Sequence, residues 1–99
     1  MNDEVIAVNQ DKMGQQAIRK VNNDTWTIFI KPLSNNDVAV AILNRSETVQ
    51  STQIDFKDLG LIENYAIRDL WEHKIIGKGK KWNGNILAHE TKMFRLVKR

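Results

Sequence analysis

Short apolar runs separated by polar turn residues make up most of this chain. Residues 25–31 combine β-branched and aromatic side chains, which predicts a strand that either ends at Pro32 or lies at a sheet edge there. Residues 38–43 are apolar at every position, and turn residues bracket them closely. A strand buried on both faces explains this second run better than a helix, because six residues are too few for a typical helix.

The rest of the chain carries weaker signals of the same kind. In residues 48–56 polar and apolar positions alternate, so Ile54 and Phe56 are predicted to point inward. The basic segment 75–85 holds three of the five glycines and is interpreted as a loop or a loosely paired hairpin. Further strands are predicted at 16–21, 65–71 and 92–97, and one helical turn at 58–61.

Seven or eight short strands with no long helical period between them predict an all-β fold. Their spacing of about 8–12 residues is typical of an antiparallel sandwich or barrel. The chain has 99 residues, which corresponds to one domain. Residues 4–9 are compatible with either the end of a helix or a short apolar strand, and residues 11–14 with a turn.

The amino-acid composition argues against several kinds of site and partner. There is no cysteine, which excludes disulfides, thiolate nucleophiles and cysteine-based metal sites. No apolar run approaches 18 residues, so no membrane partner is predicted. The acidic start at residues 1–4 lacks the pattern of a secretion signal. The chain is therefore interpreted either as intracellular or as a fragment that begins inside a longer protein.

The net charge is +3, and many of the basic side chains lie in the last quarter of the sequence. Spaced surface lysines are usually solvated, so no nucleic-acid partner is predicted. A small nucleic-acid-binding barrel that uses Lys78–Lys81 is a minor alternative, and it would bind more weakly as the salt concentration rises.

The sequence contains no recognisable group of catalytic or metal-binding residues. His73 and His89 lack metal-ligand spacing, and no nucleophile-elbow, dinucleotide or phosphate-loop motif is present. Four carboxylates lie at predicted strand ends or turns and are explained as caps, turn formers or surface charges; these are Asp55, Asp58, Asp69 and Glu72. No catalytic, cofactor-binding or metal-binding residue is predicted.

Aromatic side chains offer the one candidate for binding. Trp26, Tyr65 and Trp71 lie in predicted strands and are interpreted mainly as core residues. Trp82 lies in the basic, glycine-containing segment and is expected to be the most exposed ring. Trp82, together with Tyr65, is the candidate for stacking on sugars. In addition, residues 44–46 (Asn-Arg-Ser) match a glycosylation sequon.

Five segments, taken in order, carry a resemblance that covers nearly the whole chain. Together they are similar to the C-terminal portion of α-galactosidases of glycoside hydrolase family 27. The segments are Val5–Asp11 (VIAVNQD), Lys31–Ser34 (KPLS), Val38–Arg45, Asp58–Leu61 (DLGL) and Arg68–Lys74 (RDLWEHK). Lys12, the Ala88-His89-Glu90 turn and residues 78–85 depart from the family pattern, which affects the expected loop shapes but not the expected fold.

The resemblance implies a small antiparallel β-sandwich of Greek-key type that follows a catalytic (β/α)8 barrel. It implies that residues 1–14 are a remnant of the last barrel helix and linker, that residues 15–99 are the sandwich, and that Met1 is an expression start. The nucleophile and acid/base aspartates of the family belong to barrel motifs that this sequence lacks. The implied parent is a secreted or periplasmic retaining α-galactosidase, with an α-N-acetylgalactosaminidase as the alternative.

Two hypotheses for the function follow. In the first, the chain is a non-catalytic accessory domain that packs against its own N-terminal barrel and stabilises it. In the second, it is a carbohydrate-binding module that contacts a galactoside oligosaccharide or polysaccharide through Trp82 and Tyr65. Neither hypothesis calls for a cofactor.

Overall fold

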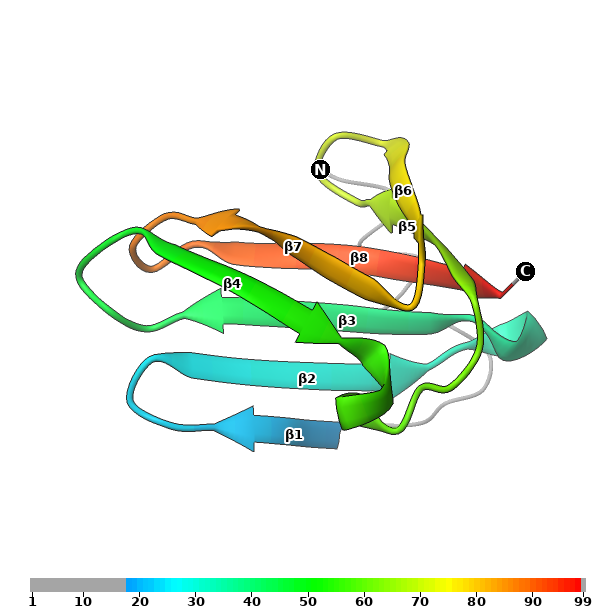
Figure 1. Ribbon diagram of the computed structural model, residues 1–99, viewed down its shortest axis with the longest axis horizontal. Helices are drawn as coiled ribbons and strands as arrows, with labels where there is room; N and C mark the ends of the chain where they lie inside the picture. The colour runs from blue at the N-terminus through cyan, green and yellow to red at the C-terminus, as the bar shows by residue number, and fades with distance from the viewer. Residues whose placement is uncertain (1–17, 99) are drawn as a thin grey trace.

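A computed structural model describes residues 18–98, which form eight strands in two antiparallel sheets (Figure 1). The all-β prediction is therefore confirmed. The strands are β1 (Ile18–Asn22), β2 (Trp26–Pro32), β3 (Val38–Asn44), β4 (Gln50–Asp55), β5 (Tyr65–Asp69), β6 (Lys74–Gly79), β7 (Lys81–Ile86) and β8 (Thr91–Lys98). The predictions for residues 4–9 and 11–14, and the proposed boundary at residue 14, lie outside the described residues.

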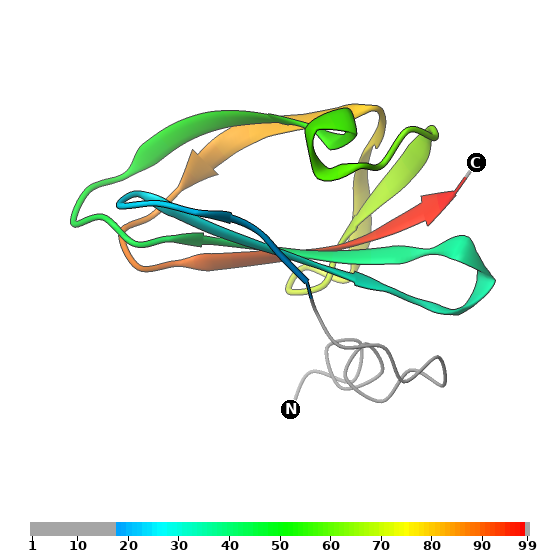
Figure 2. The same cartoon turned by 90° about the horizontal axis from the view of Figure 1, so that it is seen from below.

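The two sheets differ in size and lie one above the other as the layers of a sandwich (Figure 2). The large sheet has six strands in the order β1-β2-β3-β8-β5-β6, and the small sheet consists of β4 and β7. Strand β8 lies between β3 and β5, and β4 leaves the large sheet to pair with β7. These crossovers give the Greek-key type of connection that the family resemblance implies.

Local chemistry explains where the strands begin and end. The turn between β1 and β2 is closed by Asn23, whose Oδ1 accepts hydrogen bonds from the N–H groups of Thr25 and Trp26 at 2.9 and 2.7 Å. Pro32 is the last residue of β2, as its missing N–H predicts. The helical turn predicted at 58–61 begins two residues earlier, as the 3-10 helix η2 (Phe56–Leu59), and is followed by Gly60 in the left-handed region with φ of 81°.

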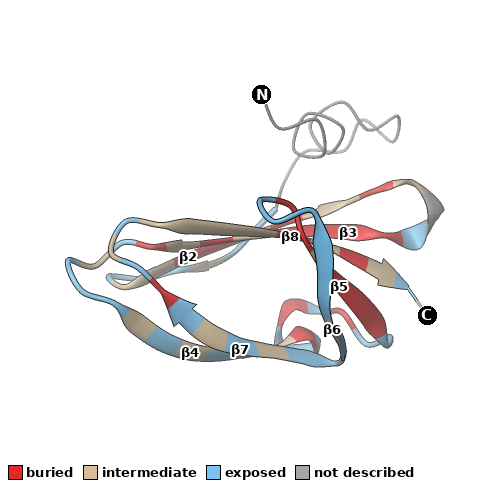
Figure 3. Cartoon of the chain, turned by 90° about the horizontal axis from the view of Figure 1, so that it is seen from above, coloured by how far each residue is buried: buried red, intermediate tan, exposed pale blue. Residues whose placement is uncertain are grey.

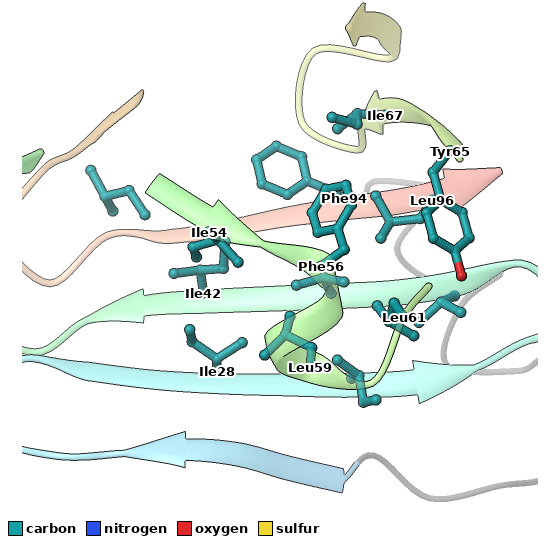
Figure 4. Close-up of a cluster of buried hydrophobic side chains, with 14 residues drawn as sticks. Ile28, Ile42, Ile54, Phe56, Leu59, Leu61, Tyr65, Ile67, Phe94 and Leu96 are labelled. Atoms are coloured by element: carbon teal, nitrogen blue, oxygen red, sulfur yellow. The ribbon is translucent and has the colours of Figure 1, made fainter. Parts of the chain in front are cut away.

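The main core lies between the two sheets and is formed mainly by inward-pointing residues of β2, β3, β4, β5, β7 and β8 (Figure 4). Ile54 and Phe56 both point into it, which confirms the predicted alternation. Ile42, Phe94 and Leu96 supply its floor from the middle of the large sheet, and each is at most 1% exposed. The two central strands therefore anchor the sandwich.

The segment 75–85 is neither a loop nor a hairpin, so that interpretation is wrong. Strand β6 pairs with β5 in the large sheet, while β7 pairs with β4 in the small one. The chain changes layers between them at Gly79, whose φ of 135° is outside the range that residues with a Cβ ordinarily adopt. The glycines thus mark a sheet-to-sheet crossing.

The prediction that Trp71 fills the core is also wrong. Strand β5 ends at Asp69, and Trp71 lies in the turn that follows, with 48% of its surface exposed. Asp69 forms this turn, because its carboxylate accepts hydrogen bonds from the N–H groups of Trp71 and Glu72 at 2.8 and 3.0 Å. The apolar and aromatic pattern of the sequence continues from Asp69 to Trp71, and it therefore predicts a strand that is longer than β5.

Asn44 of the sequon is fully buried at the end of β3. Its Nδ2 donates to the carbonyl oxygens of Thr48, Ile86 and Leu87 at 2.8, 2.9 and 3.2 Å. Its Oδ1 accepts from the N–H and hydroxyl of Ser46 at 2.9 and 2.7 Å. The atom that would carry a glycan is thus the donor that joins the two turns at one end of the sandwich.

We predict that Asn44→Ala lowers the free energy of unfolding by about 2–4 kcal/mol, because buried carbonyl groups lose their donor. Urea denaturation followed by tryptophan fluorescence measures the change. The matched control is Asn85→Ala on exposed β7, where a change within about 0.5 kcal/mol is expected. Equal losses in the two variants would contradict the role given to Asn44.

Candidate functional site

The large sheet has a second apolar face, which is turned away from β4 and β7. Strand pairing shows which residues share it: Phe29 of β2 lies opposite Ala41 of β3, and Ala41 lies opposite Met93 of β8. Ala39 and Leu43 lie on the same face, since alternate residues of a strand point the same way. We call these five residues, Phe29, Ala39, Ala41, Leu43 and Met93, the outer patch.

A small buried cluster adjoins the outer patch. Leu33 and Leu70 are each 1% exposed and pack with Ala39, and Met93 packs against this cluster. A solvated face of an antiparallel sheet would show polar residues at these positions. Strand β3 is instead mostly buried on both sides, as its unbroken apolar run predicts (Figure 3).

Exposed apolar side chains lie beyond the patch on the β5–β6 hairpin. The indole of Trp71 is held at β8, because its Nε1–H donates to the carbonyl of Thr91 at 3.1 Å. On β6, Ile75 is 47% exposed and Ile76 is 38% exposed. Several of these side chains would lose unfavourable contact with water if another protein surface covered this side.

A row of basic residues borders the patch. Lys31, Arg95 and Arg68 lie in register with Ala39 across four strands of the large sheet. Arg95 donates from Nε to the carboxylate of Asp37 at 3.0 Å, and that aspartate is 9% exposed. The face therefore combines an apolar centre with a positively charged row, a composition common at interaction surfaces.

The two rings proposed for sugar stacking are directed mainly into the protein. The ring of Trp82 on β7 is half-buried and packs against that of Phe94, with centroids 5.0 Å apart. Gly84 makes room for it, since a Cβ there would approach the indole to 2.8 Å. Tyr65 is 4% exposed and meets Phe56 edge-on at 5.9 Å. A stacking role for Trp82 and Tyr65 stays a prediction.

Most of the acidic residues have structural contacts, while Asp55 and Asp58 border the same hollow. Asp69 holds the turn after β5, and Asp55 lies opposite Lys81 in the small sheet. Glu72 is 3.8 Å from Lys74. Within residues 18–98 no three His, Asp or Glu side chains are placed to hold a metal ion. In the same range no helix is long and apolar enough to span a bilayer.

The histidines lie in turns with left-handed backbone. His73 and His89 have φ values of 58° and 60°. The Nε2 of His89 is 3.1 Å from the Glu47 carboxylate, which links the β3–β4 turn to the β7–β8 turn. That neither residue belongs to a metal-ligand set stays a prediction.

The fold defines the chain as a small antiparallel β-sandwich domain. A family model described as the alpha galactosidase C-terminal beta sandwich domain matches residues 23–96. The chain belongs to this family.

Curated relatives are much longer than this chain. An α-galactosidase from Cyamopsis tetragonoloba is 37% identical over 101 residues, which cover 99% of the chain and 25% of the relative. α-Galactosidase A from Aspergillus niger is 36% identical, covering 96% of the chain and 18% of the relative. The chain thus spans about a quarter or less of these proteins, and the catalytic part of such enzymes is absent from it.

Solved structures of the same family share the fold. α-Galactosidase I from Mortierella vinacea superposes with a TM-score of 0.89 at 27% identity, covering 99% of this chain and 27% of that one. A family 27 β-L-arabinopyranosidase from Geobacillus stearothermophilus gives a TM-score of 0.87 at 26% identity, covering 98% and 22%. One sandwich therefore accompanies enzymes with different sugar specificities.

The surroundings of Tyr65 lead to a prediction about pH. Burial, and then the nearby Glu63 carboxylate, raise the pKa of the Tyr65 phenol above its ordinary value of 10.0. The neutral phenol is favoured in the folded state, so its stability contribution is complete below about pH 10 and falls as the pH rises toward the folded pKa. The chain has a single tyrosine, so tyrosinate absorbance measures this titration directly.

We expect the absorbance midpoint to lie above pH 10 in the folded chain and near pH 10 in concentrated urea. Glu63→Gln should lower the folded midpoint, because it removes the negative charge beside the phenol. In Tyr65→Phe the free energy of unfolding should fall less steeply above pH 10, because the titrating phenol is absent. A folded midpoint at or below the midpoint in urea would contradict this account.

Proposed function

We propose that this domain docks through its outer patch on the catalytic (β/α)8 barrel of an α-galactosidase and stabilises that barrel. The observation that carries the proposal is the apolar outer side of β3, where Ala41 and Leu43 are half-buried and Ala39 is buried. A two-layer sandwich needs one apolar face on each sheet. The second apolar face is explained if a third layer, supplied by the barrel, packs on it.

The barrel surface that fits this face is apolar, because the centre of the outer patch is apolar. Residues 1–14 would supply the connection, as the remnant of the last barrel helix and its linker. The whole protein would hydrolyse terminal α-galactosides by the retaining mechanism, with both carboxylates in the barrel. The similarity to α-galactosidases along the length of the chain supports this substrate class.

A domain-exchange experiment tests the proposal. This chain replaces the corresponding C-terminal quarter of the Cyamopsis tetragonoloba α-galactosidase, and hydrolysis of p-nitrophenyl α-galactoside is followed during heating. Ala41→Glu places a charge in the centre of the patch, so we expect the chimera to lose about 2–4 kcal/mol of stability. The turnover number before heating should be unchanged.

The matched control is Gln53→Glu, which adds the same charge on the exposed side of β4. It should leave the thermal inactivation of the chimera unchanged. In the isolated chain both variants should have similar denaturation midpoints. If both variants inactivate at the same rate in the chimera, the barrel does not use the outer patch.

We also propose, as the second function, that the domain contacts a galactoside through Trp82 and Tyr65. It is supported by the partial exposure of Trp82 on β7. Titration with galactomannan oligosaccharides should quench tryptophan fluorescence, and Trp82→Phe should reduce the quenching. Trp71→Phe is the matched control, and equal loss in both variants would argue against Trp82.

A further inference from the structure

The free edge of β4 differs from both edges of the large sheet. Among residues 18–98, β4 pairs with β7 on one side and with no strand on the other (Figure 1). Its register with β7 runs without interruption from Gln50 to Asp55. Its sequence, Gln-Ser-Thr-Gln-Ile-Asp, contains no lysine, arginine, proline or glycine.

Both edges of the large sheet have bulges and lysine residues, which hinder the pairing of a further strand. In β1 the pairing skips Lys20, so this residue forms a bulge between Arg19 and Val21. In β6 the pairing skips Ile76 in the same way, and Lys74 and Lys78 flank the bulge. Edge protection is therefore built into the large sheet but is missing from β4.

A hollow lies directly beside the free edge. Its floor is formed by Val21, Trp26 and Ile28 of the large sheet, and one wall by residues 52–55 of β4. The helix η2 closes the hollow with Asp58 and Leu59. Its volume is about 200 Å³, and it exists because two strands cannot cover a six-stranded sheet.

We propose that the free edge of β4 accepts an extended segment of a separate polypeptide as the third strand of the small sheet. The backbone groups of β4 would pair with the segment, as in other cases of strand addition. Alternate side chains of the added strand would point down onto Val21 and Trp26, which are half-buried. The segment would therefore carry small apolar residues at every second position and polar residues between them.

A second copy of this chain does not fit as the occupant. If the β4 strands of two copies paired antiparallel about a two-fold axis, their small sheets would join into one layer. Their large sheets would then lie side by side in the other layer. Each large sheet extends past β4 through β2 and β1, which contribute the floor of the hollow. The two floors would collide before the β4 edges came within the roughly 4.8 Å spacing of paired strands.

The site lies in the layer opposite the outer patch, and so on the side away from the barrel if the proposed function is correct. The inference itself rests on the edge and the hollow and does not need the barrel. Strand addition at β4 and docking through the outer patch are therefore tested by separate variants.

The test uses the 99-residue chain labelled with nitrogen-15 and a capped peptide of alternating threonine and valine. We expect saturable shifts in the backbone amides of residues 50–55 and in the indole N–H of Trp26. The same peptide with every backbone amide N-methylated should bind at least about tenfold more weakly, because it has no backbone donors for β4. Equal affinity for both peptides would overturn strand addition.

Val21→Lys should weaken peptide binding about tenfold by placing a charge in the floor. Asn85→Lys, on the exposed side of β7, should leave it unchanged. If Val21→Lys fails to fold, Val21→Thr serves instead, with about threefold weaker binding expected. Shifts confined to β1 or β6 would overturn the proposal.

Discussion

A six-stranded sheet with two apolar faces has to be covered by something, and the small sheet covers only part of one face. Ile42, Phe94 and Leu96 lie under β4 and β7 and are almost fully buried. Val21 and Trp26 lie at the margin of that cover and stay half-buried. The unequal size of the two layers thus accounts for the position of the core and for the hollow beside β4.

The sequence predicts the strands well where side-chain chemistry is strictly local. The strands predicted at 25–31 and 38–43 agree with β2 and β3 to within one residue at every end, because Pro32 and the turn residues limit them. Strand pairing is harder to predict, because it depends on contacts far apart in sequence. Nothing local in 75–85 shows that β6 and β7 belong to different sheets, although Gly79 marks the crossing.

Aromatic residues show where pattern reasoning about a site fails. Trp71 and Trp82 lie in segments that resemble a strand and a loop, yet the first is exposed in a turn and the second packs on Phe94. Their exposure is decided by which sheet covers them, and that is a property of the tertiary fold. The outer patch was partly predictable, because a run that is apolar on both faces of β3 requires cover on both.

The position of β8 has a consequence for how the domain is made. The last strand of the described chain lies in the middle of the large sheet, between β3 and β5. During synthesis β1, β2 and β3 are completed first. The edge of β3 that faces away from β2 stays unpaired until β8 has been synthesised. Until then that edge is available to other chains, so the most exposed period of this protein is just before synthesis of the domain is complete.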